Sequence, residues 1–243
     1  MGILEYLLLI LVTGGGAFVQ RVTGFGMGIF AMLFLPYFLP SHNVAVAVMG
    51  MIAAIGAVYN TVRHRKSIQL KVMLPLVGAA MAVIPLAVHL SASLPQSVIK
   101  RLLGAVLVVL SIYFLFFSNR VHLKPTVPNG ILAGLVAGML NGMFNTGGPP
   151  AVLYLIHATA DNAAYFATIQ AFFAATNTFS TVTRAVSGLL TPQVLGLSAV
   201  AAVGWWSGNT LGAKIFNKLD ADRLRKLIYY GMIVSGVLMI VQG

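Results

Sequence analysis

The chain has 243 residues, of which 59% are hydrophobic and only 8% are charged, and its mean hydropathy is +0.93. A soluble globular protein usually carries about 25% charged residues, so this composition excludes that class and indicates an integral membrane protein. The net charge of +11 does not indicate nucleic-acid binding, because the basic residues lie mostly between apolar segments, where membrane topology explains them.

The first apolar block runs over about residues 3–39 and is interrupted by glycines and polar residues. The interrupting stretch, Gly16–Gly28, carries Gln20, Arg21 and Thr23, followed by glycine at positions 24, 26 and 28. Glycine weakens a helix and permits positive φ, so we expect the helix to break here. The N-terminus lacks the basic region of a cleaved signal peptide, so we expect the first helix to remain in the protein.

Three further helices are expected in the first half, over about residues 44–62, 72–90 and 97–117. A basic loop at 63–71 separates the first two of them. The polar and basic segment 118–125 is the best candidate for a joint between two halves. We therefore assign residues 1–124 to a first membrane repeat and residues 125–243 to a second, together forming one transport unit.

The second half repeats this plan. An apolar block over about residues 128–158 contains the stretch Gly138–Pro150, where glycine, asparagine, threonine and two prolines interrupt the apolar run. The helices expected after it cover about residues 162–187, 192–213 and 222–241, with a basic loop at 214–226. Arg63 and Arg184 end corresponding helices, and the preserved order of such matches supports an internal duplication.

Two interrupted segments at corresponding places favour a functional interpretation of the breaks. A broken backbone at membrane depth is tolerated only where it is packed in protein or lines a wet cavity. In transporters built from repeats, such breaks mark the substrate site, because half-helix N-termini offer N–H groups to an anion. The alternative is that the glycines only let helices pack closely.

The basic residues decide between two topologies. If the block at 3–39 crosses the membrane once, the loops at 63–71 and 214–226 lie on opposite sides. If it forms a hairpin, these loops and segment 118–125 share one side, which then holds eleven of the 15 Lys and Arg residues. Cytoplasmic loops favour Lys and Arg, so we predict the hairpin, with both termini outside and Lys100 and Arg101 as exceptions.

The predicted fold is an all-α integral membrane protein with two inverted repeats, each a broken helical hairpin followed by three transmembrane helices. The duplicated glycine-rich motif, the half-length of about 120 residues and the helical pattern resemble the TauE/SafE family of membrane anion exporters. This resemblance covers essentially the whole chain. It implies movement of sulfite, sulfoacetate or a related organosulfonate across the bacterial inner membrane, and it implies a homodimer.

Arg21 is the first candidate for substrate contact, because an arginine within a membrane segment costs several kcal/mol unless it is paired or hydrated. The planar guanidinium of Arg21 suits a sulfite or sulfonate oxyanion. Alternatively, Arg21 lies near the cytoplasmic face and its side chain reaches the membrane–water interface. Arg184 is interpreted as an interfacial anchor, and Asn60 and Gln170 as polar contacts between helices. The proposed substrate-binding residues are Gln20, Arg21, Thr23, Gly24, Phe25, Gly26, Asn145, Thr146, Gly147, Gly148, Pro149 and Asn177.

Only four acidic residues occur, all near expected helix ends or loops: Glu5, Asp161, Asp220 and Asp222. A cation pump normally needs buried carboxylates, so this distribution argues against one and leaves no carboxylate proton relay. The chain has no cysteine and its five histidines lack metal-ligand spacing, so we expect neither a metal nor another cofactor.

The predicted function is export of a small sulfur oxyanion or organosulfonate by alternating access, driven by the membrane potential. Proton- or sodium-coupled uptake of the same anions is the main alternative. An intramembrane hydrolase is a remote one, because the chain has no cysteine and no Gly-x-Ser-x-Gly elbow. A non-transporting scaffold leaves both breaks unexplained. The expected partners are a small anion and the lipid bilayer, and not nucleic acid.

Overall fold

The computed structural model describes residues 2–117, 123–215 and 221–242, and within them every regular element is helical. The predicted all-α class is therefore confirmed. The predicted joint at 118–125 and the loop at 214–226 fall partly on residues 118–122 and 216–220, which lie outside the described residues. The elements are α1 Ile3–Thr23, α2 Met27–Met32, α3 Leu35–Phe38, α4 His42–His64, η1 Arg65–Ser67, α5 Leu70–Ser93, α6 Gln96–Ile112, η2 Tyr113–Phe117, α7 Val127–Phe144, α8 Gly148–Ala158, α9 Asn162–Val186, α10 Pro192–Ile215 and α11 Ala221–Gln242.

Both glycine-rich motifs break a helix and turn the chain back. Gly16 of α1 lies against Met27, and Gly15 lies against the ring of Phe30 further along α2, so α2 runs antiparallel to α1. In the second motif the end of α8 lies near the start of α7, where Gly130 contacts the ring of Tyr154. The predicted broken hairpins are therefore present at both places.

The helices gather into two compact units, and each unit draws on both halves of the sequence. The first unit comprises Met1–Met49, Ser93–Asn119 and Leu190–Gly243. The second comprises Gly50–Ala92 and Arg120–Leu189. The division at residue 124 into two sequence repeats stays a prediction.

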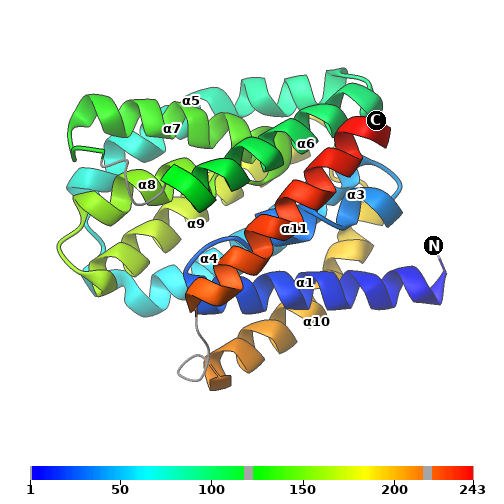
Figure 1. Ribbon diagram of the computed structural model, residues 1–243, viewed down its shortest axis with the longest axis horizontal. Coiled ribbons are helices and arrows are strands. Elements are labelled where there is room, and N and C mark those ends of the chain that lie inside the picture. The colour runs from blue at the N-terminus through cyan, green and yellow to red at the C-terminus, as the bar shows by residue number, and fades with distance from the viewer. Residues whose placement is uncertain (1, 118–122, 216–220, 243) are drawn as a thin grey trace. The chain divides into compact units, whose positions relative to one another are not determined.

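In the first unit, α1 packs along α10, as Figure 1 shows for the blue and orange helices. Their backbones approach closely because glycines line the seam: Gly204 lies on Ile10 and Thr13, Gly208 on Gly14, and Gly212 on Arg21. The residue numbers of these contacts increase together along α1 and α10, so the two helices run in the same direction. In the same unit α6 packs on α11, where Gly104 meets Gly236 and the Ser111 hydroxyl donates to the Tyr229 carbonyl, so this pair is antiparallel.

In the second unit, α7 packs along α5 through a stripe of glycines four residues apart, and these helices lie side by side in Figure 1. The contacts ascend on both helices: Gly134 lies on Leu76, Gly138 on Ala80, and Gly142 on Ile84 and Ala87. The pair is therefore parallel, like α1 and α10. Small residues at this spacing allow close helix packing, so the alternative interpretation of the glycines as packing positions applies to this stripe.

The distribution of polarity is that of a protein in lipid. Many large apolar side chains lie on the surface, among them Leu4, Leu11, Leu132, Trp206 and Val241. Water-soluble monomers rarely expose so much contiguous apolar surface. Within the described residues, six helical segments are long and apolar enough to cross a bilayer: α1, α4 with η1, α5, α6 with η2, α7 and most of α11. The chain is a multi-pass membrane protein.

Two predicted spans, α9 and α10, are long enough to cross but are not among these six apolar helices. Helix α9 has 25 residues and buries a series of polar side chains, including Gln170, Asn177 and Arg184. A helix whose polar face is covered by protein does not need an apolar sequence all round. That α9 and α10 cross the membrane stays a prediction. The polar face of α9 contributes residues to the candidate site.

Candidate functional site

The first break follows Thr23 and is made by glycine. Gly24 ends α1 with a φ of 85° and Gly26 precedes α2 with a φ of 97°, a left-handed backbone that favours glycine. The Thr23 hydroxyl lies 2.9 Å from the carbonyl of Val19 and 2.6 Å from that of Phe25. Its single proton is therefore engaged within the break and is not available to a substrate.

Side chains from other helices fill the first break. The Phe25 ring lies 5.9 Å from the ring of Phe114, which stacks on Tyr229 at 4.8 Å with an interplanar angle of 5°. Arg225 of α11 donates a hydrogen bond of 3.2 Å to the carbonyl of Thr23 at the end of α1. A cation at that end satisfies a carbonyl and opposes the negative pole of the helix. The first break is thus capped and covered by aromatic packing.

Gln20 and Arg21 are half-buried on the last turns of α1. The aliphatic stem of Arg21 lies against Gly212 of α10, where a side chain larger than hydrogen would meet its Cβ and Cγ atoms. Arg21 therefore belongs to the seam between α1 and α10. The contact of its guanidinium with an anion stays a prediction.

The second break follows Phe144 and uses asparagine in place of glycine. Asn145 has a φ of 55° and is the one non-glycine residue with positive φ in the described part of the chain. Its N–H bonds the carbonyl of Asn141 at 2.9 Å, and the N–H of Thr146 bonds that of Leu140 at 3.3 Å. Asparagine tolerates this conformation better than most residues, which explains how the chain turns here without glycine.

Helix α8 begins two residues beyond Thr146, and its first turn has fewer N–H groups than the sequence interpretation assumed. Gly147 precedes the helix, and Pro149 and Pro150 occupy its first positions after Gly148. Proline has no N–H, so the backbone offers an anion fewer donors than a helix N-terminus usually does. Any ligand at this break must therefore rely more on side chains.

Arg184 supplies such a side chain, and its predicted role as an interfacial anchor is wrong. It is only 1% exposed, and its Nη2 donates to the carbonyl of Gly142 in the last turn of α7. Next to it, the Ser91 hydroxyl of α5 donates to the carbonyl of Met143 at 3.4 Å. Arg184 lies inside the protein because it shares the buried face of α9 with Gln170 and Asn177, at intervals of seven residues.

Several buried polar atoms of the second break and of the buried face of α9 have no hydrogen-bond partner. They are Nε and Nη1 of Arg184, Nδ2 of Asn141, Nδ2 of Asn145, the hydroxyl of Thr146 and Oδ1 of Asn177. The side chains are nearly inaccessible, since Thr146 is 1%, Asn177 4% and Asn145 7% exposed. Leaving a buried donor unsatisfied costs about 1–3 kcal/mol, more for a charged group, so such a cluster is a candidate ligand site.

The charge of Arg184 is also unbalanced. None of its nitrogens meets a carboxylate among the described residues, because Nη2 bonds a carbonyl and the other two have no partner. Asp161, the acidic residue on the same helix, lies at the opposite end and caps α9 by accepting from the Ala164 N–H at 2.8 Å. Four of the five side chains in the cluster carry the unpaired donors, so the cluster suits an anion.

One polar contact agrees with the sequence interpretation. The Asn60 amide of α4 donates to Gln170 Oε1 of α9 at 3.3 Å, so these residues link two helices of the second unit. They are not part of the cluster at the second break.

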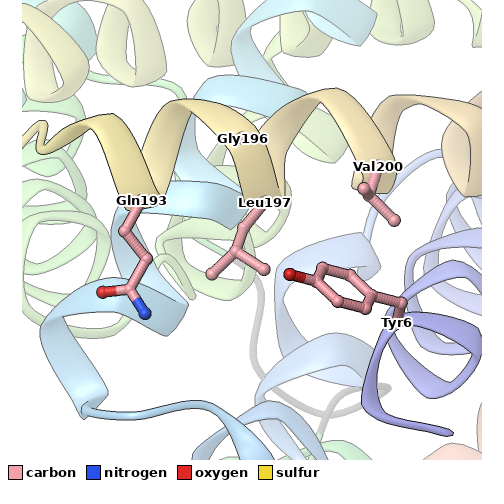
Figure 2. Close-up of a pocket in the computed structure, with 5 residues that line it drawn as sticks. All are labelled: Tyr6, Gln193, Gly196, Leu197 and Val200. Carbon is pink, nitrogen blue, oxygen red and sulfur yellow. The ribbon is translucent and has the colours of Figure 1, made fainter. Parts of the chain in front are cut away.

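The surface hollow in the first unit does not resemble an anion site. Figure 2 shows Tyr6 of α1 directed toward Leu197 of α10, with Gln193 and Val200 beside them. Tyr6 lies in the first turn of α1, far along the helix from Arg21, and no charged side chain lines the hollow. The candidate site is therefore the cluster at the second break.

A family model described as Sulfite exporter TauE/SafE matches residues 7–239, nearly the whole chain. The chain belongs to the TauE/SafE family. No curated protein and no solved structure matches it. As a TauE/SafE protein it is a membrane transporter of an anion-exporting family and not an enzyme, and its partners are a small anion and the lipid bilayer.

Two members of the cluster in this TauE/SafE protein were not predicted as site residues. The position of Arg184 near a helix end favours an interfacial anchor, and Asn141 stands alone among apolar and glycine residues, which gives no local sign of a site. The spacing of Gln170, Asn177 and Arg184 by seven residues would have indicated a shared helical face. Asn141, four residues before Asn145, would have been indicated in the same way.

Proposed function

We propose that this TauE/SafE protein exports a small sulfur oxyanion or organosulfonate, such as sulfite or sulfoacetate, by alternating access. The observation that carries the proposal is the buried Arg184, which lies at a helix break among unpaired donors and meets no carboxylate among the described residues. A buried cation without a counter-charge is strongly destabilising, and a transported anion supplies that charge transiently.

The packing directions support inverted repeats. Successive spans joined by short loops alternate in direction. If each half made four single crossings, its last helices α6 and α11 would run in the same direction, whereas a hairpin followed by three spans makes them antiparallel. Within the first unit, α6 and α11 are antiparallel. We therefore propose that the two halves of the sequence cross the membrane in opposite directions. Transporters with this symmetry alternate between outward- and inward-open states by moving one part of the fold against another.

The membrane potential is sufficient as a driving force for export. One negative charge leaving a cell that is negative inside gains about 2.3 kcal/mol per 100 mV. The chain has four acidic residues in total, and neither Glu5 nor Asp161 lies in the interior of a span. We therefore propose transport without a coupled cation.

Flux in proteoliposomes tests this proposal. Purified protein is reconstituted with sulfite or methanesulfonate inside the vesicles, and a potassium gradient with valinomycin sets the voltage. Efflux should increase about tenfold when the inside is made about 60 mV more negative for a single charge. Efflux that ignores voltage but follows a proton or sodium gradient would support coupled transport, the main alternative, in its place.

We further propose an inner-membrane location with both termini outside, in agreement with the basic and exposed loop that contains Arg63, Arg65, Lys66 and Lys71. The absence of native cysteine allows a direct test. Ser67→Cys should react with a membrane-impermeant maleimide only in inside-out vesicles, and Ser93→Cys only in right-side-out cells. The reverse pattern would contradict this orientation. The homodimer implied by the family stays a prediction.

A further inference from the structure

We propose that Arg184 binds the transported anion directly and that Asn145 and Thr146 complete its coordination. This inference rests on the proposed function and adds the residues that hold the substrate. It also moves the positive charge of the site from Arg21, the candidate favoured by sequence, to a side chain at the other break.

The first argument is the number of donors that Arg184 retains. A guanidinium has five N–H groups arranged along two edges, each edge presenting two parallel donors. The bond from Nη2 to the Gly142 carbonyl uses one of them, and neither Nε nor Nη1 has a partner. One complete two-donor edge therefore remains. The bond to Gly142 also restricts the movement of the guanidinium before a ligand arrives.

The second argument is the chemistry of the neighbouring side chains. Asn145 follows the last turn of α7, three residues after the carbonyl that holds Arg184, and Thr146 is next to it. The amide nitrogen of Asn145 and the hydroxyl of Thr146 are both buried and unpartnered. Together with the Arg184 edge they supply up to four donors at the second break.

These donors define the class of ligand. Two parallel N–H groups match two oxygens on one central atom, as in a sulfite, sulfonate or carboxylate group. Further donors favour a third oxygen on that atom, which sulfite and sulfonates have and carboxylates lack. A halide has no pair of oxygens, and a cation is repelled by Arg184. The site therefore selects compact oxyanions with three oxygens on one centre.

Three substitutions remove single elements of the site with little change of shape. Arg184→Lys keeps a charge and one donor for the Gly142 carbonyl but loses the two-donor edge. Asn145→Gly keeps the positive φ of 55° without strain and removes the amide. Thr146→Val keeps the volume of the side chain and removes the hydroxyl.

The matched control is Thr176→Val. Thr176 is also a fully buried threonine of the second unit, but its hydroxyl already donates to the carbonyl of Phe172 at 2.8 Å. Arg63→Gln is the control for charge, because it removes an exposed arginine that is not a candidate site residue. Neither control should change anion affinity by more than about twofold.

The measurement is isothermal titration of the purified full chain in detergent with sulfite, methanesulfonate, acetate and chloride. We expect sulfite and methanesulfonate to bind more tightly than acetate, and chloride not to compete. Arg184→Lys should weaken sulfite binding about 10- to 100-fold, and Asn145→Gly and Thr146→Val about 3- to 10-fold each. Unchanged affinity in Asn145→Gly and Thr146→Val, which should both fold, would overturn the proposal even if Arg184→Lys does not fold.

Two further outcomes would assign Arg184 a different role. If phosphatidylglycerol added to the micelles stabilises the wild type through Arg184 and free anions do not, the arginine holds a lipid headgroup and the proposal fails. If the variants lose stability but sulfite raises their melting temperature as much as that of the wild type, Arg184 only caps α7 and the proposal again fails.

The experiments test the proposed export function and the proposed anion site separately. Binding that depends on these residues without any flux in proteoliposomes would refute export and leave the anion site in place. Normal sulfite flux in all three variants would refute the site and leave export in place.

Discussion

The two breaks turn the chain in the same way but are surrounded by different chemistry. At the first, Thr23 bonds its own segment and the rings of Phe25, Phe114 and Tyr229 fill the space. At the second, donors without partners surround a buried arginine. An arginine caps the broken helix in both cases, through the carbonyl of Thr23 or of Gly142. A broken hairpin is therefore a structural element, and its neighbours decide whether it binds a ligand.

The largest effect is expected from the glycine seams behind the breaks. A methyl group on Gly138 would overlap the backbone of Ala80, and one on Gly208 the backbone of Gly14. Gly138→Ala and Gly208→Ala should each cost about 3 kcal/mol or more and yield little monodisperse protein by size-exclusion chromatography. Gly78→Ala, where no atom lies within 4 Å, is the control and should behave as wild type. Tolerance of either seam variant would contradict the close packing.

The next effect compares the two capping arginines. Arg184→Gln should reduce sulfite efflux from proteoliposomes at least 100-fold, because it removes the charge that balances the anion. Arg225→Gln should lower the melting temperature, through loss of about 1–2 kcal/mol of helix capping, and leave efflux within about threefold of wild type. Equal losses of efflux in the two variants would show that both breaks contact the substrate, which would remove the distinction between them.

A smaller effect on stability is expected from substitutions at the two turns, which distinguish the role of the backbone conformation from that of the side chain. Gly24→Ala forces a Cβ into a backbone with a φ of 85° and should destabilise the protein by about 1–2 kcal/mol. Asn145→Gly should change stability by less than about 1 kcal/mol, because glycine accepts the same conformation. Thermal unfolding followed by tryptophan fluorescence measures both. A larger loss in Asn145→Gly than in Gly24→Ala would mean that the Asn145 amide supports the fold.

The smallest effect concerns the aromatic packing at the first break. Phe114→Leu removes the stack with Tyr229 and should cost about 0.5–1.5 kcal/mol beyond the lost apolar area. Sulfite affinity should not change, because neither ring belongs to the cluster at the second break. A change in affinity above about threefold by titration would place the first break next to the substrate as well.

The helices and the two breaks could be predicted because they depend on local chemistry. Apolar runs of bilayer length, glycine at 24 and 26, and the dense small residues of Gly138–Pro150 are all legible along the chain. The helix predicted at about 162–187 is α9, Asn162–Val186. The site was predicted less well than the helices. The sequence favours Arg21 as the substrate contact and indicates an interfacial anchor at Arg184. A single helix end gives no sign of whether another helix covers it.

Composition and periodicity by themselves determined that this chain is helical, lies in a membrane, and turns back on itself at two places. Those properties follow from the cost of unpaired backbone in lipid and from the freedom of glycine, both of which act within a few residues. Only the packed structure decided which polar groups lack partners. That property depends on residues far apart in sequence, such as Arg184 of α9 and Gly142 of α7, meeting where water is excluded.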